Sequence, residues 1–223
     1  MSVWAVLVAA GRGDRLALDR PKAFAKLAGR PLLAESLERL DRSDWVDAVV
    51  VVAPPEWEEP VILLAEEVGA GKLTACVTGG ETRAQSVRAG VAAVPSEAAV
   101  ILVHDAARPI LPDDVIERVL APLGEGCDGA VPALPIADTV KRIRGDDVVE
   151  TLPRGELAAA QTPQAFAAGA LRAALGGDAD ASDCASLVEA RGGRVKIVPG
   201  DRRLLKVTDA EDLALIERLL VAR

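Results

Sequence analysis

The chain has 223 residues, and its 26 Lys and Arg residues against 34 Asp and Glu residues give a formal net charge of −8. This length predicts a single domain with a core of its own, and the hydrophobic fraction of 50% excludes an intrinsically disordered chain. The negative net charge counts against a general nucleic-acid binder, because neutralising a phosphate backbone takes a basic surface. It leaves room for a local basic pocket that binds a small phosphorylated molecule.

The cysteine and histidine content excludes one kind of metal site and indicates the cellular compartment. Cys76, Cys127 and Cys184 lie far apart, and with His104 as the single histidine no cysteine–histidine zinc set can be assembled. Unpaired thiols favour a reducing compartment. No apolar run approaches the roughly 20 residues of a membrane span, and the apolar N-terminal run lacks a basic leader, so we expect a strand there and not a signal peptide. The sequence therefore predicts a cytoplasmic protein with no membrane or nucleic-acid partner.

Short continuous apolar runs alternate with segments of helical periodicity. The apolar runs predict strands buried on both faces, as in a mostly parallel sheet, at 3–8, 48–53, 99–103 and 130–134. Helices are expected at 32–40, 82–93, 112–120 and 208–220. Capping-box patterns at Thr82–Gln85 and Thr208–Glu211 predict where two of these helices begin. The alternation predicts an α/β fold, a Rossmann-like, mostly parallel sheet flanked by helices, in one domain over residues 1–223.

One stretch breaks this alternation. Residues 138–152 contain two β-type runs on either side of Gly145-Asp146-Asp147, which is the pattern of a hairpin. The stretch is rich in charge and has few side chains that could anchor it in a core. We therefore expect an arm at about 136–156 that protrudes from the domain and contacts a partner.

The loop after the first strand carries two glycines and two cations. Gly11 and Gly13 let a backbone approach phosphate oxygens closely. A dinucleotide-binding fingerprint would need a third glycine where Leu16 stands, and a Walker loop would need Gly-Lys-Ser/Thr. Arg15 and Lys22 are spaced to bring two positive charges to the same phosphates, which suits charge stabilisation at a triphosphate. The alternative is a glycine turn with two solvated cations.

Two later segments also end strands or begin helices with charged residues. Asp105 follows a buried strand, so its carboxylate lies on the ligand side of an open α/β sheet and could hold Mg²⁺, directly or through water. The alternative is a structural ion pair between Asp105 and Arg108. His104 is expected to be a packed histidine and not a base. Lys206 precedes the last helix, where it either binds an anion or lies on the surface.

Taken together, these elements resemble the 2-C-methyl-D-erythritol 4-phosphate cytidylyltransferase family. Seven motifs in family order carry the resemblance and cover essentially the whole chain, at 9–22, 79–87, 103–109, 138–142, 162–166, 182–186 and 206–208. The resemblance implies in-line attack of the substrate phosphate on the α-phosphorus of CTP, with Mg²⁺ or another divalent cation. A phosphate monoester is largely ionised near neutral pH, so no general base is needed, and fixed cations relieve the repulsion between the anions.

The resemblance also implies roles for individual residues. Arg15 and Lys22 would stabilise the transition state, and Lys206 would position the incoming phosphate. The nucleotide is expected at Ala9, Ala10, Gly11, Gly13, Gly80, Glu81, Ser86, Asp105 and Ala106. The sugar-alcohol phosphate is expected at Asp105, Arg108, Thr139, Arg154 and Lys206, and the metal at Asp105. In the family the arm exchanges between the subunits of a homodimer, so Thr139 and Arg154 would reach the neighbour's substrate.

Some positions depart from the family pattern. Ala23 stands where a glutamine is usual, and Glu81 stands where aspartate is common. Cys184 replaces a second acid after Asp183, and Leu204-Leu205 replaces an asparagine-containing pair. None of these changes removes a proposed cation, but the last two affect the substrate end of the pocket.

Three other functions compete with the main one. A related family that transfers CMP to ribitol 5-phosphate shares most of the motifs, but Ala-Ala between Asp105 and Arg108 favours methylerythritol phosphate. A nicotinamide-dependent oxidoreductase is disfavoured by Leu16 and by the Arg15 and Lys22 pair. A nucleotide-binding module without catalytic activity would have little need of these cations.

Overall fold

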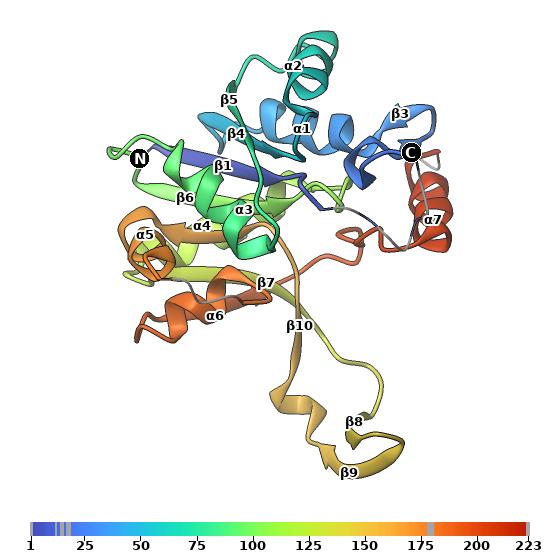
Figure 1. The fold of residues 1–223 in the computed structure, drawn as a ribbon. Coiled ribbons are helices and arrows are strands. Elements are labelled where there is room, and N and C mark those ends of the chain that lie inside the picture. The colour runs from blue at the N-terminus through green and yellow to red at the C-terminus, as the bar shows by residue number, and fades with distance from the viewer. Residues whose placement is uncertain (1, 12, 14–15, 17–18, 178–180, 222–223) are drawn as a thin grey trace.

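The computed structural model describes residues 2–11, 13, 16, 19–177 and 181–221. Among them, eight strands form the main sheet in the order β10-β7-β11-β6-β1-β4-β5, with β12 paired to β7 (Figure 1). These strands are β1 Val3–Val8, β4 Ala48–Ala53, β5 Leu73–Thr78, β6 Val100–Asp105, β7 Gly129–Pro135, β10 Ala158–Ala160, β11 Gln164–Ala167 and β12 Val195–Pro199. Strands β5, β4, β1 and β6 run parallel, and β11 runs antiparallel between β6 and β7. The mostly parallel α/β fold is therefore confirmed.

Helices cover both faces of the sheet. They are α1 Leu32–Arg42, α2 Glu58–Glu67, α3 Arg83–Ala92, α4 Asp113–Gly124, α5 Ala168–Leu175, α6 Cys184–Glu189 and α7 Ala210–Val221. Side chains alternate along a strand, so β1 sends Ala5 and Leu7 into a core with α1, α2 and α4. Val6 points the other way, into a core with α3, α5 and α6. Within the described residues, no helix has the length and apolar character to cross a membrane.

The start of α3 is as predicted, and the start of α7 differs by one residue. Thr82 caps α3, and Gln85 completes the capping box. In α7 the cap is Asp209, whose carboxylate accepts the amide of Asp212 at 3.0 Å, and not Thr208. Thr208 instead donates its own amide to the Asp212 carboxylate at 2.8 Å. Aspartate accepts helix N–H groups as well as threonine does. Either Thr208 or Asp209 could therefore have been the N-cap of α7.

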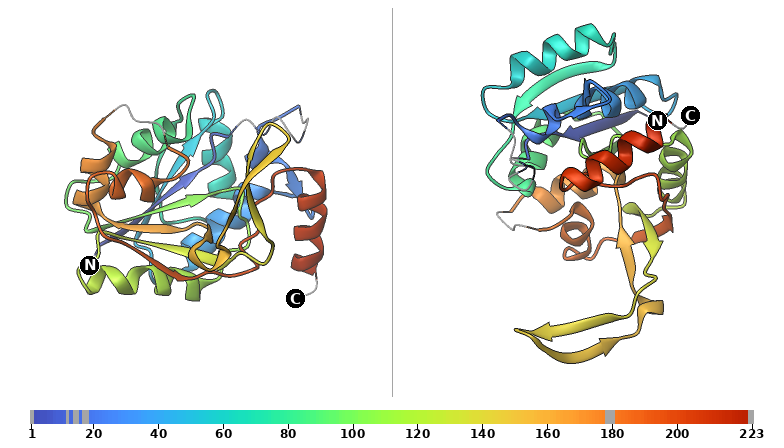
Figure 2. Two further views of the ribbon diagram at one scale, coloured as in Figure 1. Left: turned by 90° about the horizontal axis from the view of Figure 1, so that it is seen from below. Right: turned by 90° about the vertical axis from the view of Figure 1, so that its right-hand side faces the viewer.

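A small two-stranded sheet at the edge of the molecule packs against the last helix, α7. The short strands β2 Lys26–Leu27 and β3 Arg30–Pro31 pair with each other, and α7 packs beside them (Figure 2). Leu27, Ile110 and Ile216 belong to one buried apolar cluster that fixes this packing. The cluster brings the segment before α7, which carries Lys206, next to the loop after β1.

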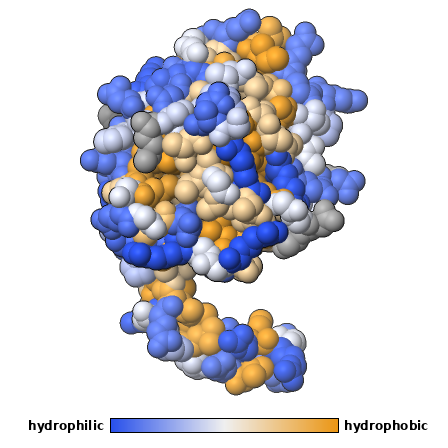
Figure 3. All heavy atoms as spheres, turned by 90° about the vertical axis from the view of Figure 1, so that its left-hand side faces the viewer, coloured by the Kyte–Doolittle hydropathy of each residue, from blue (hydrophilic) through white to orange (hydrophobic). Residues whose placement is uncertain are grey.

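The predicted arm is a hairpin that stands apart from the body. Strands β8 Val140–Arg144 and β9 Asp147–Leu152 pair only with each other in the described structure, and the turn places Gly145 at φ +59° (Figures 1 and 2). The short helix η3, Arg154–Glu156, leads back to the sheet. Ile143, Val148 and Val149 are 64%, 60% and 53% exposed, and Figure 3 shows apolar side chains on the arm among hydrophilic ones.

The contact of α3 with the sheet predicts the effect of adding one methyl group. A Cβ at Gly90 would lie 2.4 Å from Val6 Cγ1 and 2.7 Å from Val52 Cγ2, whereas a Cβ at Gly124, also helical, meets nothing within 4 Å. We expect Gly90→Ala to lower the free energy of unfolding by about 1–3 kcal/mol. Gly124→Ala should leave it unchanged or raise it by up to about 1 kcal/mol. Urea unfolding of both variants checks this, and equal effects would contradict the packing described.

Candidate active site

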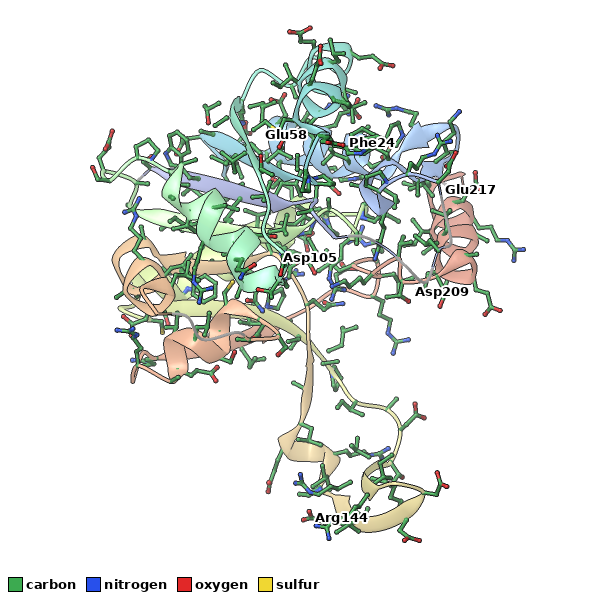
Figure 4. The ribbon with its side chains drawn as sticks, in the orientation of Figure 1. Phe24, Glu58, Asp105, Arg144, Asp209 and Glu217 are labelled. Atoms are coloured by element: carbon green, nitrogen blue, oxygen red, sulfur yellow. The ribbon has the colours of Figure 1, made fainter. Side chains whose placement is uncertain are left out.

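A cavity of about 920 Å³ opens where four parallel strands end. Its wall includes Val8 at the end of β1, Pro54 after β4, Gly79 after β5 and Asp105 at the end of β6. Ligands bind outside the carboxyl ends of the strands in open α/β sheets, and this cavity has that position. Figure 4 shows Asp105 near the middle of the molecule, beside the first turn of α3.

Most of the residues expected at the site line this one cavity. They are Ala9, Ala10, Gly11, Gly13, Lys22, Gly80, Glu81, Ser86, Asp105, Ala106 and Lys206. Arg108, Thr139 and Arg154 are not among the lining residues, and the last two lie in the arm segment. Arg15 lies outside the described residues. The expected site residues that the structure describes thus meet in space, except for Arg108 and the two arm residues.

Two glycines are needed for close approaches around the cavity. Gly13 has φ +73°, and a Cβ there would lie 2.4 Å from Lys22 Cβ. Lys22 begins the 3-10 turn η2, Lys22–Phe24, directly after Pro21. A Cβ at Gly79 would lie 2.3 Å from Ala10 Cβ and 2.9 Å from Ser86 Oγ. The glycines therefore let the loop after β1 lie against Lys22 and against the β5–α3 turn.

The N-terminus of α3 forms part of the wall. Thr82 caps the helix, and the Ser86 hydroxyl accepts the Gly80 amide at 3.1 Å and donates to the Thr82 carbonyl at 3.0 Å. These bonds hold Gly80 and Glu81 in a fixed turn at the edge of the cavity. The positive end of a helix favours bound anions, so this wall suits a phosphorylated ligand.

Asp105 lies at the floor of the cavity between two cations. Arg83 Nη2 donates to Oδ1 at 3.1 Å, and Lys206 Nζ donates to Oδ2 at 2.7 Å. Asp105 as a whole residue is only 7% exposed. Burial by itself would raise its pKa, but the charges of Arg83 and Lys206 outweigh burial and hold the pKa of Asp105 well below its usual range. The group is therefore an anion at neutral pH.

The alternative of an Asp105–Arg108 ion pair is wrong. Asp105 forms its ion pairs with Arg83 and Lys206 and not with Arg108. Arg108 Nη1 instead donates to the backbone carbonyl of Leu204. This hydrogen bond does not involve the side chain of Leu204, one of the two residues that depart from the family pattern. The Lys206 side chain is 39% exposed, and it lines the cavity and pairs with Asp105.

The sequence did not predict that Arg83 would lie at the site. It is the first residue of α3, it lines the cavity, and its Nη1 approaches the Cys184 sulfur at 3.6 Å. Cys184, one of the departures from the family pattern, therefore contacts the Arg83–Asp105 pair. The one feature of the sequence that could have indicated Arg83 is its position in the motif 79–87, immediately after the helix cap Thr82. Its partner is Asp105, and no local pattern indicates that pairing.

His104 is the packed histidine that the sequence predicts. It is fully buried; its Nε2 lies 3.1 Å from the Arg108 carbonyl, and its Nδ1 lies 3.1 Å from Thr162 Oγ1. Burial lowers the pKa of His104 to about 4. The imidazole is thus neutral at pH 7 and holds the β6 turn by hydrogen bonds on both ring nitrogens.

This environment predicts a pH dependence of stability. On acidification the unfolded chain protonates its histidine first, near pH 6.5, while the folded chain resists until about pH 4. The contribution of His104 to the free energy of unfolding is therefore fully present above about pH 6.5. It falls with the pH, by about 2 kcal/mol between about pH 7 and pH 5. Urea unfolding in a chelator-containing buffer measures the loss. His104→Gln should remove this part of the slope, and an unchanged slope would contradict the assignment.

Comparison with known proteins agrees with the geometry. The family model described as 2-C-methyl-D-erythritol 4-phosphate cytidylyltransferase matches residues 3–222. A relative of that name from Rubrobacter xylanophilus is 42% identical, over 98% of this chain and 95% of its own length. One from Nocardia farcinica is 43% identical, over 100% and 95%. The crystal structure of the Thermus thermophilus enzyme of that name superposes with a TM-score of 0.79 at 33% identity, over 97% of this chain and 98% of that one.

The family match spans nearly the whole chain, and four of the seven motifs that carried the resemblance contribute lining residues to the cavity. The glycine loop, the α3 turn, Asp105 and Lys206 occupy one place in the fold. The chain belongs to the 2-C-methyl-D-erythritol 4-phosphate cytidylyltransferase family.

Proposed function

We propose that this chain transfers CMP from CTP to 2-C-methyl-D-erythritol 4-phosphate. The products are 4-diphosphocytidyl-2-C-methyl-D-erythritol and pyrophosphate, in isoprenoid precursor biosynthesis by the non-mevalonate pathway. The observation that carries the proposal is the gathering of Lys22, Lys206 and the α3 N-terminus around one cavity in a chain of this family. The family match also favours methylerythritol phosphate over ribitol 5-phosphate as the acceptor.

The reaction depends on charge and position. A phosphate oxygen of the acceptor forms a bond to the α-phosphorus of CTP, and the bond to the oxygen bridging to the β-phosphorus breaks, so the electron pair leaves with pyrophosphate. The attacking phosphate is already ionised, which fits a site whose single histidine is buried and neutral. Cations fixed before the reaction stabilise the charge that develops on the five-coordinate phosphorus. Lys22 and, by the sequence motif, Arg15 take this role.

The two ends of the cavity receive the two substrates. At one end, the backbone at Gly11, Gly13 and Gly80 approaches the nucleotide, with the other nucleotide-binding residues Ala9, Ala10, Glu81, Ser86 and Ala106 around it. At the other end, Lys206 binds the acceptor phosphate, held in place by Asp105. Arg108 stabilises the backbone just before Lys206, because its side chain donates to the Leu204 carbonyl.

Asp105 also fits a divalent cation, for which Mg²⁺ is the proposed ion. Among the described residues no group of three or more His, Cys, Asp or Glu side chains could hold a metal. Mg²⁺ commonly uses one or two carboxylates together with substrate phosphates and water, and Asp105 is an ionised carboxylate on the cavity wall. When bound, the ion would neutralise phosphate charge.

The arm completes the site in a homodimer. In a single chain Thr139 and Arg154 belong to the arm segment and not to the cavity wall, and Arg154 donates to the Ala137 carbonyl. We propose that a second copy supplies them. The exposed Ile143, Val148 and Val149 support this, because a partner would bury them. Three free thiols support the proposed cytoplasmic location.

Pyrophosphate release tests the proposed function. The chain is incubated with CTP, Mg²⁺ and either methylerythritol 4-phosphate or ribitol 5-phosphate. We expect release with the first acceptor. Faster release with ribitol 5-phosphate would assign the sister activity, and CTP binding without release from either acceptor would indicate a nucleotide-binding module.

Lys22→Ala separates catalysis from nucleotide binding. Because Lys22 meets charge that develops in the transition state, kcat should fall roughly 10³-fold while the Kd for CTP rises less than about tenfold. Lys26→Ala removes a nearby exposed lysine that does not line the cavity and serves as the matched control. Equal losses in kcat and CTP affinity would show that Lys22 only binds the nucleotide.

Arg154→Ala tests the exchanged arm. Loss of a charged contact to the acceptor phosphate should raise the KM for the alcohol phosphate by about 10–100-fold and leave the KM for CTP nearly unchanged. Arg191→Ala, at an exposed arginine on the body, is the control. A change confined to the KM for CTP would refute the arm assignment.

A further inference from the structure

An aromatic pair lies at the edge of the cavity. The chain has only three Trp and two Phe residues and no Tyr. Phe166 is fully buried in the core, but the other phenylalanine, Phe24, packs on Trp57 with ring centroids 4.5 Å apart and an interplanar angle of 48°. Trp57 lines the cavity. Figure 4 shows Phe24 near Glu58, the residue that follows Trp57.

The pair joins two turns that are far apart in the sequence. Trp57 donates its amide to the Pro54 carbonyl at 3.1 Å, in the turn between β4 and α2, and its own carbonyl accepts the Val61 amide at 3.1 Å. Phe24 ends the 3-10 turn that Lys22 begins, and its amide donates to the Pro21 carbonyl at 2.9 Å. The rings therefore connect the Lys22 turn to the β4–α2 turn, where Trp57 is the N-cap of α2.

The turn benefits from such a contact. On its other side, the Gly13 backbone lies directly against Lys22, since a Cβ at residue 13 would be only 2.4 Å from Lys22 Cβ. Lysine carries its charge on a flexible stem, so the position of the ammonium group depends on the backbone that presents it. A catalytic group displaced by about 1 Å can cost about 100-fold in rate. The tilted contact between the two rings holds this turn by apolar packing and places no further charge at the phosphates.

We infer that Trp57 is a positioning residue: through Phe24 it holds the 3-10 turn that presents Lys22 to the reacting phosphates. The catalytic role of Lys22 in this inference rests on the proposed function. The part that concerns the packing of the turn does not depend on activity. Trp57 is not required to touch the nucleotide for this role. Its effect should appear in kcat and in the stability of the turn.

Hydrogen exchange tests the turn directly. The Phe24 and Ala25 amides donate to the Pro21 and Lys22 carbonyls at 2.9 and 3.0 Å. Trp57→Ala should speed exchange of these amides by about tenfold or more, because local opening becomes easier. Trp45→Ala removes a half-exposed tryptophan that does not line the cavity and should leave them unchanged. Unchanged exchange in Trp57→Ala would overturn the inference whether or not the chain is active.

Kinetics test the link to Lys22. Trp57→Ala should lower kcat about tenfold with less than about a threefold change in the KM for CTP, and Trp57→Phe should restore most of the loss. In the Lys22→Ala background, adding Trp57→Ala should lower single-turnover rates by less than about twofold, since the residue that Trp57 positions is gone. The same tenfold loss in both backgrounds would overturn the inference. Wild-type chain without pyrophosphate release would instead contradict the proposed function.

Discussion

The site depends on one buried carboxylate. Asp105 receives Arg83 on one oxygen and Lys206 on the other. A carboxylate buried this deeply is costly without counter-charges, and two cations this close would repel each other without it. The three groups therefore hold each other at the carboxyl end of β6, and the walls of the cavity are built around them.

The same group of charges makes the cavity cationic. Arg83 and Lys206 against Asp105 leave one positive charge, and the remaining contact of Arg83, the Cys184 thiol, stays neutral because burial raises its pKa. Of the other charged side chains that line the cavity, Arg20 and Lys22 are offset by Asp19 and Glu81, so the described lining keeps one net positive charge. A local cationic site inside a chain of net charge −8 concentrates phosphorylated ligands there without making the whole surface attractive to nucleic acid.

The parallel sheet and its glycines bring these groups together. The strands β1, β4, β5 and β6 end at one edge, so each following loop contributes to the same cavity. Gly13 and Gly79 allow contacts that any side chain would prevent. His104 uses one ring nitrogen on the Arg108 carbonyl in the turn after β6 and the other on Thr162 Oγ1, which precedes β11. Charged side chains and backbone groups are therefore left to act on a ligand at this site, because the single histidine is not available for proton transfer.

Local patterns in the sequence determined the four apolar strands, the capped start of α3, the hairpin arm around Gly145, the glycine loop and the packed His104. Each of these depends on residues close together in the chain, where periodicity, capping and turn chemistry apply. They did not reveal β5, β10, β11 and β12, or helices α2, α5 and α6, and the cap of α7 was wrong by one residue. Tertiary structure alone decided that Asp105 pairs with Arg83, 22 residues away, and with Lys206, 101 residues away, and not with nearby Arg108. The reason is that a buried charge takes the partner that the fold places within reach, and sheet order sets that partner, not sequence spacing.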